Sequence, residues 1–96
     1  MIDDTKTFIG KEFYDLFTKN WNPPPGLFNF NLKIKEVVIP GRRNIIEVYV
    51  EDILVYKTFL FPKYDYIEEK AKEATDRVLR FIIEHYKYLN SMEEIL

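Results

Sequence analysis

Apolar residues recur at three- and four-residue steps near the start of the chain. The segment from about Asp4 to Trp21 follows this spacing, which is typical of one face of an amphipathic helix. The residues of the apolar stripe are Ile9, Phe13, Leu16, Phe17 and Trp21. Acidic and hydroxyl side chains favour helix N-termini, and the N-cap candidates are Asp3, Asp4 and Thr5. The pattern therefore predicts a first helix with one buried face.

Gly10 lies inside this predicted helix, where a glycine costs about 1 kcal/mol relative to alanine. One interpretation is strain that is tolerated near the helix start. The other, which we favour slightly, is that another backbone segment comes too close to Gly10 to leave room for a side chain.

A proline run, Pro23 to Pro25, follows the first helix. Proline has no backbone donor and stiffens the chain, so we interpret the run as a short connector. A proline-rich ligand for another domain is the alternative interpretation.

After the prolines, apolar and polar positions alternate, which predicts three half-buried strands. Their apolar residues are Phe28, Phe30, Leu32 and Ile34 in the first, Ile46, Val48 and Val50 in the second, and a run from about Ile53 to Phe61 in the third. Pro40-Gly41 and Glu51-Asp52 are turn signals between the strands, and Pro62 ends the last one.

The last apolar stripe predicts one long helix from about Tyr66 to Asn90. Asp65 and Glu68 have the spacing of a capping box with Asp65 as the N-cap. The stripe consists of Ile67, Ala71, Ala74, Val78, Phe81 or Ile82, and Leu89. The second half is apolar beyond one stripe, through Leu79, Ile83, Tyr86 and Tyr88. Such a helix is buried on most sides, so we expect either the first helix or another subunit to cover it.

The predicted order is helix, three-stranded antiparallel meander, helix, in one domain over residues 1–96. Both helices can cover one face of the sheet, which gives a two-layer α+β fold. The other sheet face is then expected to carry Asn31, Lys33, Lys35, Ile45, Glu47, Tyr49, Val55, Lys57, Phe59 and Phe61.

Charge and composition narrow the function. The net charge is −2, which argues against nucleic acid as the main partner because phosphate binding needs a basic surface. The chain has no cysteine and no apolar run near the ~18 residues of a membrane span. The acidic start does not read as a signal peptide, so for an exported protein we expect this to be the mature form. Aromatic residues make up 17%. They either form a surplus at an interface or are all accommodated in the core and as half-exposed tyrosines.

The sequence contains few residues of the kinds that form catalytic or metal sites. His85 is the single histidine and Ser91 the single serine, and the glycines are isolated, so no metal set, triad or phosphate loop is readable. We therefore expect neither enzyme activity nor a cofactor. A basic cluster remains, formed by Lys33, Lys35, Arg42, Arg43 and Lys57. It is either a solvated face or a surface that meets an acidic partner.

Several blocks of the chain resemble the CsgE family, the curli assembly and transport accessory proteins. The blocks are Asp4-Thr5, Ile9-Gly10, Glu12 to Tyr14, Phe17, Trp21, Asn31-Leu32 with Ile34 and Glu36, Ile46, Val48, Val50, and Thr58 to Pro62 with Asp65. Their order and spacing cover roughly residues 3–67. The proline connector and the apolar final helix depart from the family pattern, as does the lack of an extended polar tail.

The resemblance implies a small α+β protein of the periplasm. It implies a ring-like homo-oligomer at the mouth of the outer-membrane curli secretion channel (CsgG-like), which recognises curlin subunits and restrains their amyloid assembly without inserting into the membrane. The expected interaction residues are Trp21, Arg42, Arg43, Tyr49, Phe59 and Phe61. For Trp21 the alternative is closure of the core at the end of the first helix. A generic interaction or chaperone-like module outside the curli system is the alternative function.

Overall fold

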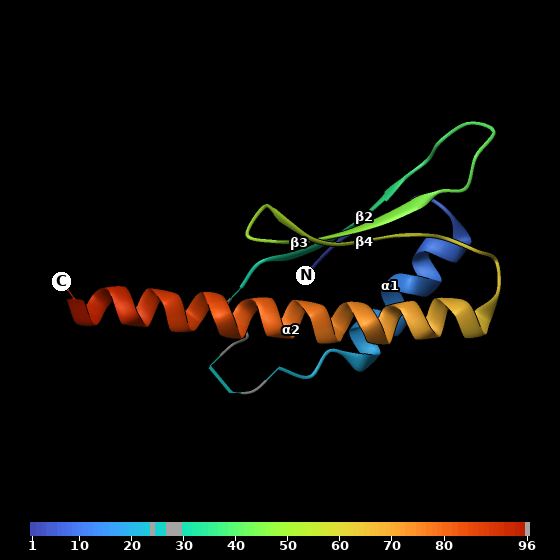
Figure 1. The fold of residues 1–96 in the computed structure, drawn as a ribbon. Helices are drawn as coiled ribbons and strands as arrows, with labels where there is room; N and C mark the ends of the chain where they lie inside the picture. Colours follow the sequence, from blue (N-terminus) through green and yellow to red (C-terminus); the bar gives the residue numbers. More distant parts are fainter. Residues whose placement is uncertain (24, 27–29, 96) are drawn as a thin grey trace.

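The computed structural model describes residues 1–23, 25–26 and 30–95, with side chains through His85 in the last helix. Its elements are β1 (Ile2–Asp4), α1 (Phe8–Asn20), β2 (Leu32–Val37), β3 (Ile45–Val50), β4 (Ile53–Phe59) and α2 (Tyr64–Ile95). The strands form a four-stranded sheet in the order β1-β2-β3-β4, and both helices lie on one side of it (Figure 1). The predicted two-layer α+β architecture is confirmed. The expected three-stranded antiparallel sheet is wrong in detail, because β1 joins it as a parallel strand.

The missed strand, β1, also displaces the start of α1. Asp3 and Asp4 pair with Ile34 and Lys35 of β2, so they are strand residues and not the predicted N-cap. The helix begins at Phe8, and the side chain of Thr7 is the N-cap, accepting the Gly10 N–H. Three residues are too few to show an alternating pattern, and aspartate is depleted in strands. The sequence pattern therefore does not predict a strand at these residues.

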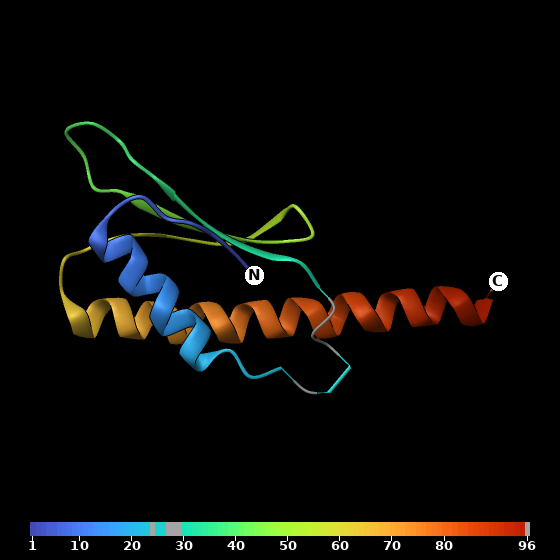
Figure 2. The same cartoon turned by 180° about the vertical axis from the view of Figure 1, so that it is seen from behind.

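Apolar faces of α1, α2 and the sheet meet in one core. Its buried members are Phe13, Leu16, Phe17, Leu32, Ile34, Ile46, Val48, Val50, Tyr56, Leu60, Ile67, Ala71, Ala74, Val78 and Ile82. The strand burial alternates along β2 and β3, as the period-two pattern predicts. The first helix crosses α2 beneath the sheet (Figure 2) and covers part of its apolar surface. The fully buried Ala71 and Ala74 permit close packing of α2 in this layer.

The second helix, α2, has 32 residues and is about 48 Å long at 1.5 Å per residue. It begins at Tyr64, so Asp65 lies in the first turn and the predicted capping box with Asp65 as N-cap is wrong. The Ile67 N–H donates to the Lys63 carbonyl at 3.0 Å, which makes Lys63 the residue before the first turn. The helix continues past the predicted end at Asn90 to Ile95, and its C-terminal end projects beyond the sheet in both views (Figures 1 and 2).

A register shift at Val48/Tyr49 changes which face β4 presents. Tyr56 pairs with Val48, but Leu54 pairs with Tyr49, so Val55 is an extra residue in the strand. Val55 was expected on the face away from the helices, and it is instead half-buried against the core. The strand also ends at Phe59, and the predicted strand residue Phe61 lies beyond it.

Glu51 and Asp52 form the predicted tight connection, with positive φ at both residues. Some predictions lie outside the described residues: those on Pro24 and Phe28, and those on the side chains of Tyr86, Tyr88, Leu89 and Ser91.

Glu36 is a buried carboxylate, 2% exposed, at the point where β2 meets the start of α1. Its Oε1 accepts the Lys6 and Thr7 N–H groups at 2.7 and 2.8 Å. Its Oε2 accepts the Thr7 hydroxyl at 2.6 Å and the Asn44 side-chain amide at 2.8 Å. Burial alone raises the pKa of Glu36, but these hydrogen bonds outweigh it and hold the pKa below the usual value of 4.5.

Gly10 makes room for this carboxylate. A Cβ at Gly10 would overlap Oε1 of Glu36 and would lie 2.6 Å from its Cδ. The close approach inferred from the sequence is therefore real, but the approaching group is a side chain and not a backbone.

We expect Gly10→Ala to lower the free energy of unfolding by about 2–4 kcal/mol, because the overlap exceeds the ~1 kcal/mol that alanine gains in helix propensity. Urea denaturation measures the change. The control is Gly41→Ala, where φ is +72° and nothing lies within 4 Å of the added Cβ. That variant is expected to lose about 1 kcal/mol from backbone strain alone. Equal losses in both variants would contradict the role of Glu36.

We expect Glu36→Gln to lose about 2–4 kcal/mol of stability at pH 7, because an amide donor replaces an acceptor among four donors. A group whose pKa is lowered by folding stabilises the folded state at pH values above its unfolded-state pKa. This stabilisation is lost as the pH falls through the folded-state pKa. The stability gap between the wild type and the variant should therefore shrink below about pH 4.5. Denaturation at several pH values measures it. The exposed Glu69→Gln is the control, and a gap independent of pH would refute the assignment.

Candidate interaction surface

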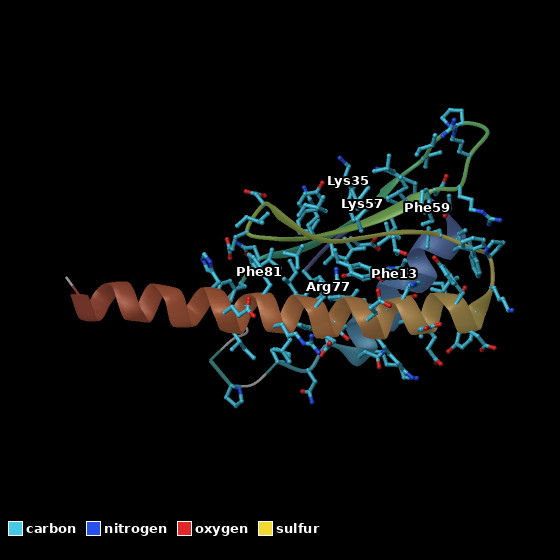
Figure 3. All side chains as sticks on the ribbon, viewed as in Figure 1. Phe13, Lys35, Lys57, Phe59, Arg77 and Phe81 are labelled. Carbon is cyan, nitrogen blue, oxygen red and sulfur yellow. The ribbon has the colours of Figure 1, made fainter. Side chains whose placement is uncertain are left out.

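The sheet face opposite the helices, here called the open face, is mixed in charge and aromatic character. Its side chains are Ile2, Asp4, Lys33, Lys35, Ile45, Glu47, Tyr49, Lys57 and Phe59. Antiparallel pairing sets Lys35 opposite Glu47 and Glu47 opposite Lys57. Lys35 and Lys57 point away from the helix layer (Figure 3).

Tyr49 occupies an ordered position on the open face. Its hydroxyl donates to Glu47 Oε1 at 2.9 Å, and Lys33 Nζ lies 4.9 Å from the centre of its ring. The hydrogen bond to the Glu47 carboxylate raises the pKa of Tyr49. Lys57 Nζ approaches Glu47 from the other side at 3.9 Å. These contacts hold the ring of Tyr49 half-buried between charged neighbours.

Arg43 and Phe61 meet at the end of the sheet. The Arg43 guanidinium lies 3.5 Å from the centre of the Phe61 ring, within the range of a cation–π contact. Phe61 packs edge-on against Tyr66 with 4.7 Å between ring centres. The Tyr66 hydroxyl donates to the Phe59 carbonyl at 2.8 Å. The phenylalanine of β4, Phe59, is 56% exposed beside this cluster.

Arg42 is exposed in the same loop as Arg43, and its N–H donates to the Ile39 carbonyl at 3.1 Å. The structure thus brings Arg42, Arg43, Phe59 and Phe61 to one end of the sheet, and Tyr49 to the face beside it. We call Arg43, Phe59, Phe61 and Tyr66 the aromatic end.

Trp21 lies elsewhere, in the helix layer. It follows α1, is half-buried, and stacks on Phe17 with 5.8 Å between ring centres. Together with Leu79 and Thr75 it lines a shallow depression. This position fits the alternative that Trp21 closes the core at the end of the first helix.

The sequence missed a groove of about 360 Å³ between β4 and α2. Its lining residues are Leu54, Val55, Glu73, Asp76, Arg77, Arg80, Phe81 and Glu84. The register shift turns Val55 toward the core and the groove, and the sequence pattern carries no signal of that shift. The sequence also missed Phe8, which is 87% exposed at the start of α1.

His85 packs among aromatic rings, stacked on Phe81 at 5.8 Å and edge-on to Phe30 at 6.4 Å. Among the residues whose placement is described, no three histidine or acidic side chains converge as metal ligands do. No helix in the described part of the chain combines the length and apolar character needed to cross a membrane.

The chain was compared with known proteins. The family model described as "Curli assembly protein CsgE" matches residues 1–94. This match confirms the resemblance that the sequence blocks indicated, and it extends over the proline connector and almost all of the final helix. No curated protein matches the chain.

We expect Trp21→Ala to lower the free energy of unfolding by about 2 kcal/mol, because Trp21 fills part of the core boundary. Phe59→Ala should change it by less than about 0.5 kcal/mol, because most of that side chain is already in water. Urea denaturation of both variants, at a low protein concentration where self-association is minimal, measures the two changes in the free energy of unfolding. A large loss in Phe59→Ala would assign Phe59 to the core and remove it from the exposed surface.

Proposed function

The chain belongs to the CsgE family of curli assembly proteins, and we propose that it acts as an export adaptor that binds curlin subunits and restrains their amyloid growth. The observation that carries the proposal, beside the family itself, is the aromatic end of the sheet. Phe59 is more than half exposed there, and Tyr66, which donates to its carbonyl, packs on Phe61, which in turn contacts Arg43.

An exposed aromatic ring beside two half-buried ones suits the capture of an unfolded client. Aromatic side chains contribute strongly to protein interfaces and lose little conformational entropy when they bind. Here Phe61 is fixed by Arg43 and Tyr66, and the Tyr66 hydroxyl ties down the backbone beside Phe59. A client segment held on such a surface is withheld from stacking into cross-β fibrils.

The exposed arginines of the β2–β3 loop suit a second partner. Arg42 and Arg43 are both exposed, and Lys35 and Lys57 lie on the adjoining open face. We propose that this basic end meets an acidic surface of the outer-membrane curli channel in the periplasm. Charges at an interface mainly set the rate and orientation of association. The channel contact should therefore weaken with added salt.

We also propose that copies of the chain assemble into a ring at the channel. The aromatic end and Trp21 are the residues whose contribution to self-association is to be tested first. Sedimentation of the protein, alone and with the cognate channel, measures both the oligomer and its transfer to the channel. A monomer that does not sediment with the channel would refute the adaptor role.

We expect the protein to delay fibril growth of its cognate curlin subunit at less than one-to-one ratio. Phe59→Ala should shorten this delay, because it removes the exposed ring from the aromatic end. The delay is read from thioflavin fluorescence over time.

Phe8→Ala is the matched control, since Phe8 is also an exposed phenylalanine but lies on α1. The aromatic end is ruled out as the client surface if both variants delay fibrils as well as the wild type. Wild-type protein without any effect on fibril growth would refute the restraint of curlin.

A further inference from the structure

The outer edge of β4 carries backbone groups that point away from the sheet. Tyr56 pairs with Val48 and Thr58 with Ile46. The Leu60 N–H donates to the Asn44 carbonyl at 2.8 Å, which fixes the even-numbered residues as those bonded to β3. Hydrogen bonding alternates along an antiparallel strand, so the N–H and C=O of Lys57 point outward, as does the Phe59 N–H.

This edge is limited at both ends. The Phe59 carbonyl is occupied by the Tyr66 hydroxyl at 2.8 Å, so pairing cannot continue past it without displacing Tyr66. At the other end, the extra residue Val55 interrupts the regular ladder. Bulges of this kind terminate pairing at sheet edges. The free edge is therefore short and centred on Lys57.

A groove runs beside this edge. Its lining includes Leu54 and Val55 of β4 and Phe81 of α2. Figure 3 shows Phe81 on the side of α2 that faces the sheet. Charged side chains of α2 rim the groove, and among them Asp76 and Arg80 are paired at 3.0 Å. The groove thus combines three apolar side chains with charged ones beside a strand edge, and pockets for side chains next to a free edge are what an extended peptide uses when it adds to a sheet.

We propose that the β4 edge and this groove bind an extended segment of a partner polypeptide, which pairs with Lys57 as a fifth strand. Side chains of a strand alternate between its two faces. Those on the helix side of the added segment enter the groove against Val55 and Phe81, and apolar residues suit them. Those on the open-face side lie next to Lys57, and acidic residues suit them. The inference rests on the proposed function, because it adds a strand-pairing site for the client next to Phe59 of the aromatic end.

The same edge argues against a second copy of this chain as the occupant. In an antiparallel pair of two β4 strands centred on the free edge, Lys57 would face Lys57 of the other copy. Like charges directly opposite each other destabilise strand pairing, and lysine on an edge strand is a common protection against self-pairing. An acidic, strand-forming segment of another protein meets no such repulsion.

The probe is a synthetic peptide of about ten residues in which glutamate and valine alternate, a length within the range of single strands. Its binding is measured by fluorescence anisotropy, and its site by amide hydrogen exchange. Exchange at Lys57 should slow on binding. Exchange at Tyr56 and Thr58 should not change, because their N–H groups already bond to β3.

Lys57→Pro removes the outward donor and no bond to β3, and we expect it to weaken peptide binding about tenfold or more. Near-ultraviolet circular dichroism checks its fold. Lys57→Glu keeps the N–H and should invert the preference, favouring a lysine–valine peptide over the glutamate–valine one. Lys63→Glu makes the same charge change outside the strand and should leave the preference unaltered.

Retained binding in a folded Lys57→Pro variant, or slowed exchange confined to residues of β2 and β3, would overturn the inference. A change of oligomer size in Lys57→Pro would also overturn it, because the edge would then join copies of this chain.

Curlin fibril assays separate the edge site from the proposed function. If wild type and Lys57→Pro delay fibrils equally, the edge site fails and the proposed function stands. If the peptide binds at Lys57 but fibrils are never delayed, the proposed function fails and the edge site stands.

Discussion

The buried carboxylate of Glu36 is the contact on which the arrangement of the fold depends. It accepts four hydrogen bonds, from the chain just before α1, from the N-cap residue Thr7 and from Asn44 in the segment before β3. A charge in the core is destabilising unless it is fully paired, so all these segments must be in place together. The Thr7 hydroxyl donates to Glu36 and accepts from Gly10, which couples the start of the helix to the same carboxylate. Gly10 completes the site by having no side chain.

Much of this fold was readable from periodicity. The alternating stretches gave β2 and β3, and the three- and four-residue spacing gave both helices, because burial of one face is the main determinant of each pattern. The parallel strand β1 was not readable, since Ile2–Asp4 is short and acidic. The position of β1 is set by residues later in the chain. It pairs with β2, and Lys11 Nζ donates to the Asp3 carboxylate at 2.8 Å. Glu36 itself was noted only as part of a family block.

The interaction residues were foreseen less well than the fold, for a geometric reason. Sequence patterns place a residue on a face of its own element, but not relative to other elements. Tyr49 and Phe59 were assigned to the face away from the helices, and they lie there. Contact between Arg43 and Phe61 depends on how two connections meet in space, which no local pattern encodes. The β4 groove depends on one extra residue in a strand, and the family resemblance, although confirmed, does not specify it.

The parallel strand β1 makes the two edges of the sheet unequal. On its side the border is a three-residue strand whose acidic side chains are tied to Thr5, Lys6 and Lys11. Short, charged borders resist pairing with other strands. The opposite border, β4, is longer and flanked by apolar side chains. The strand addition proposed for β4 would therefore extend the sheet on one side only. Such a molecule would bind one added strand at a time. A partner strand added at β4, as proposed, would therefore find no comparable second edge on the same molecule at which another strand could pair.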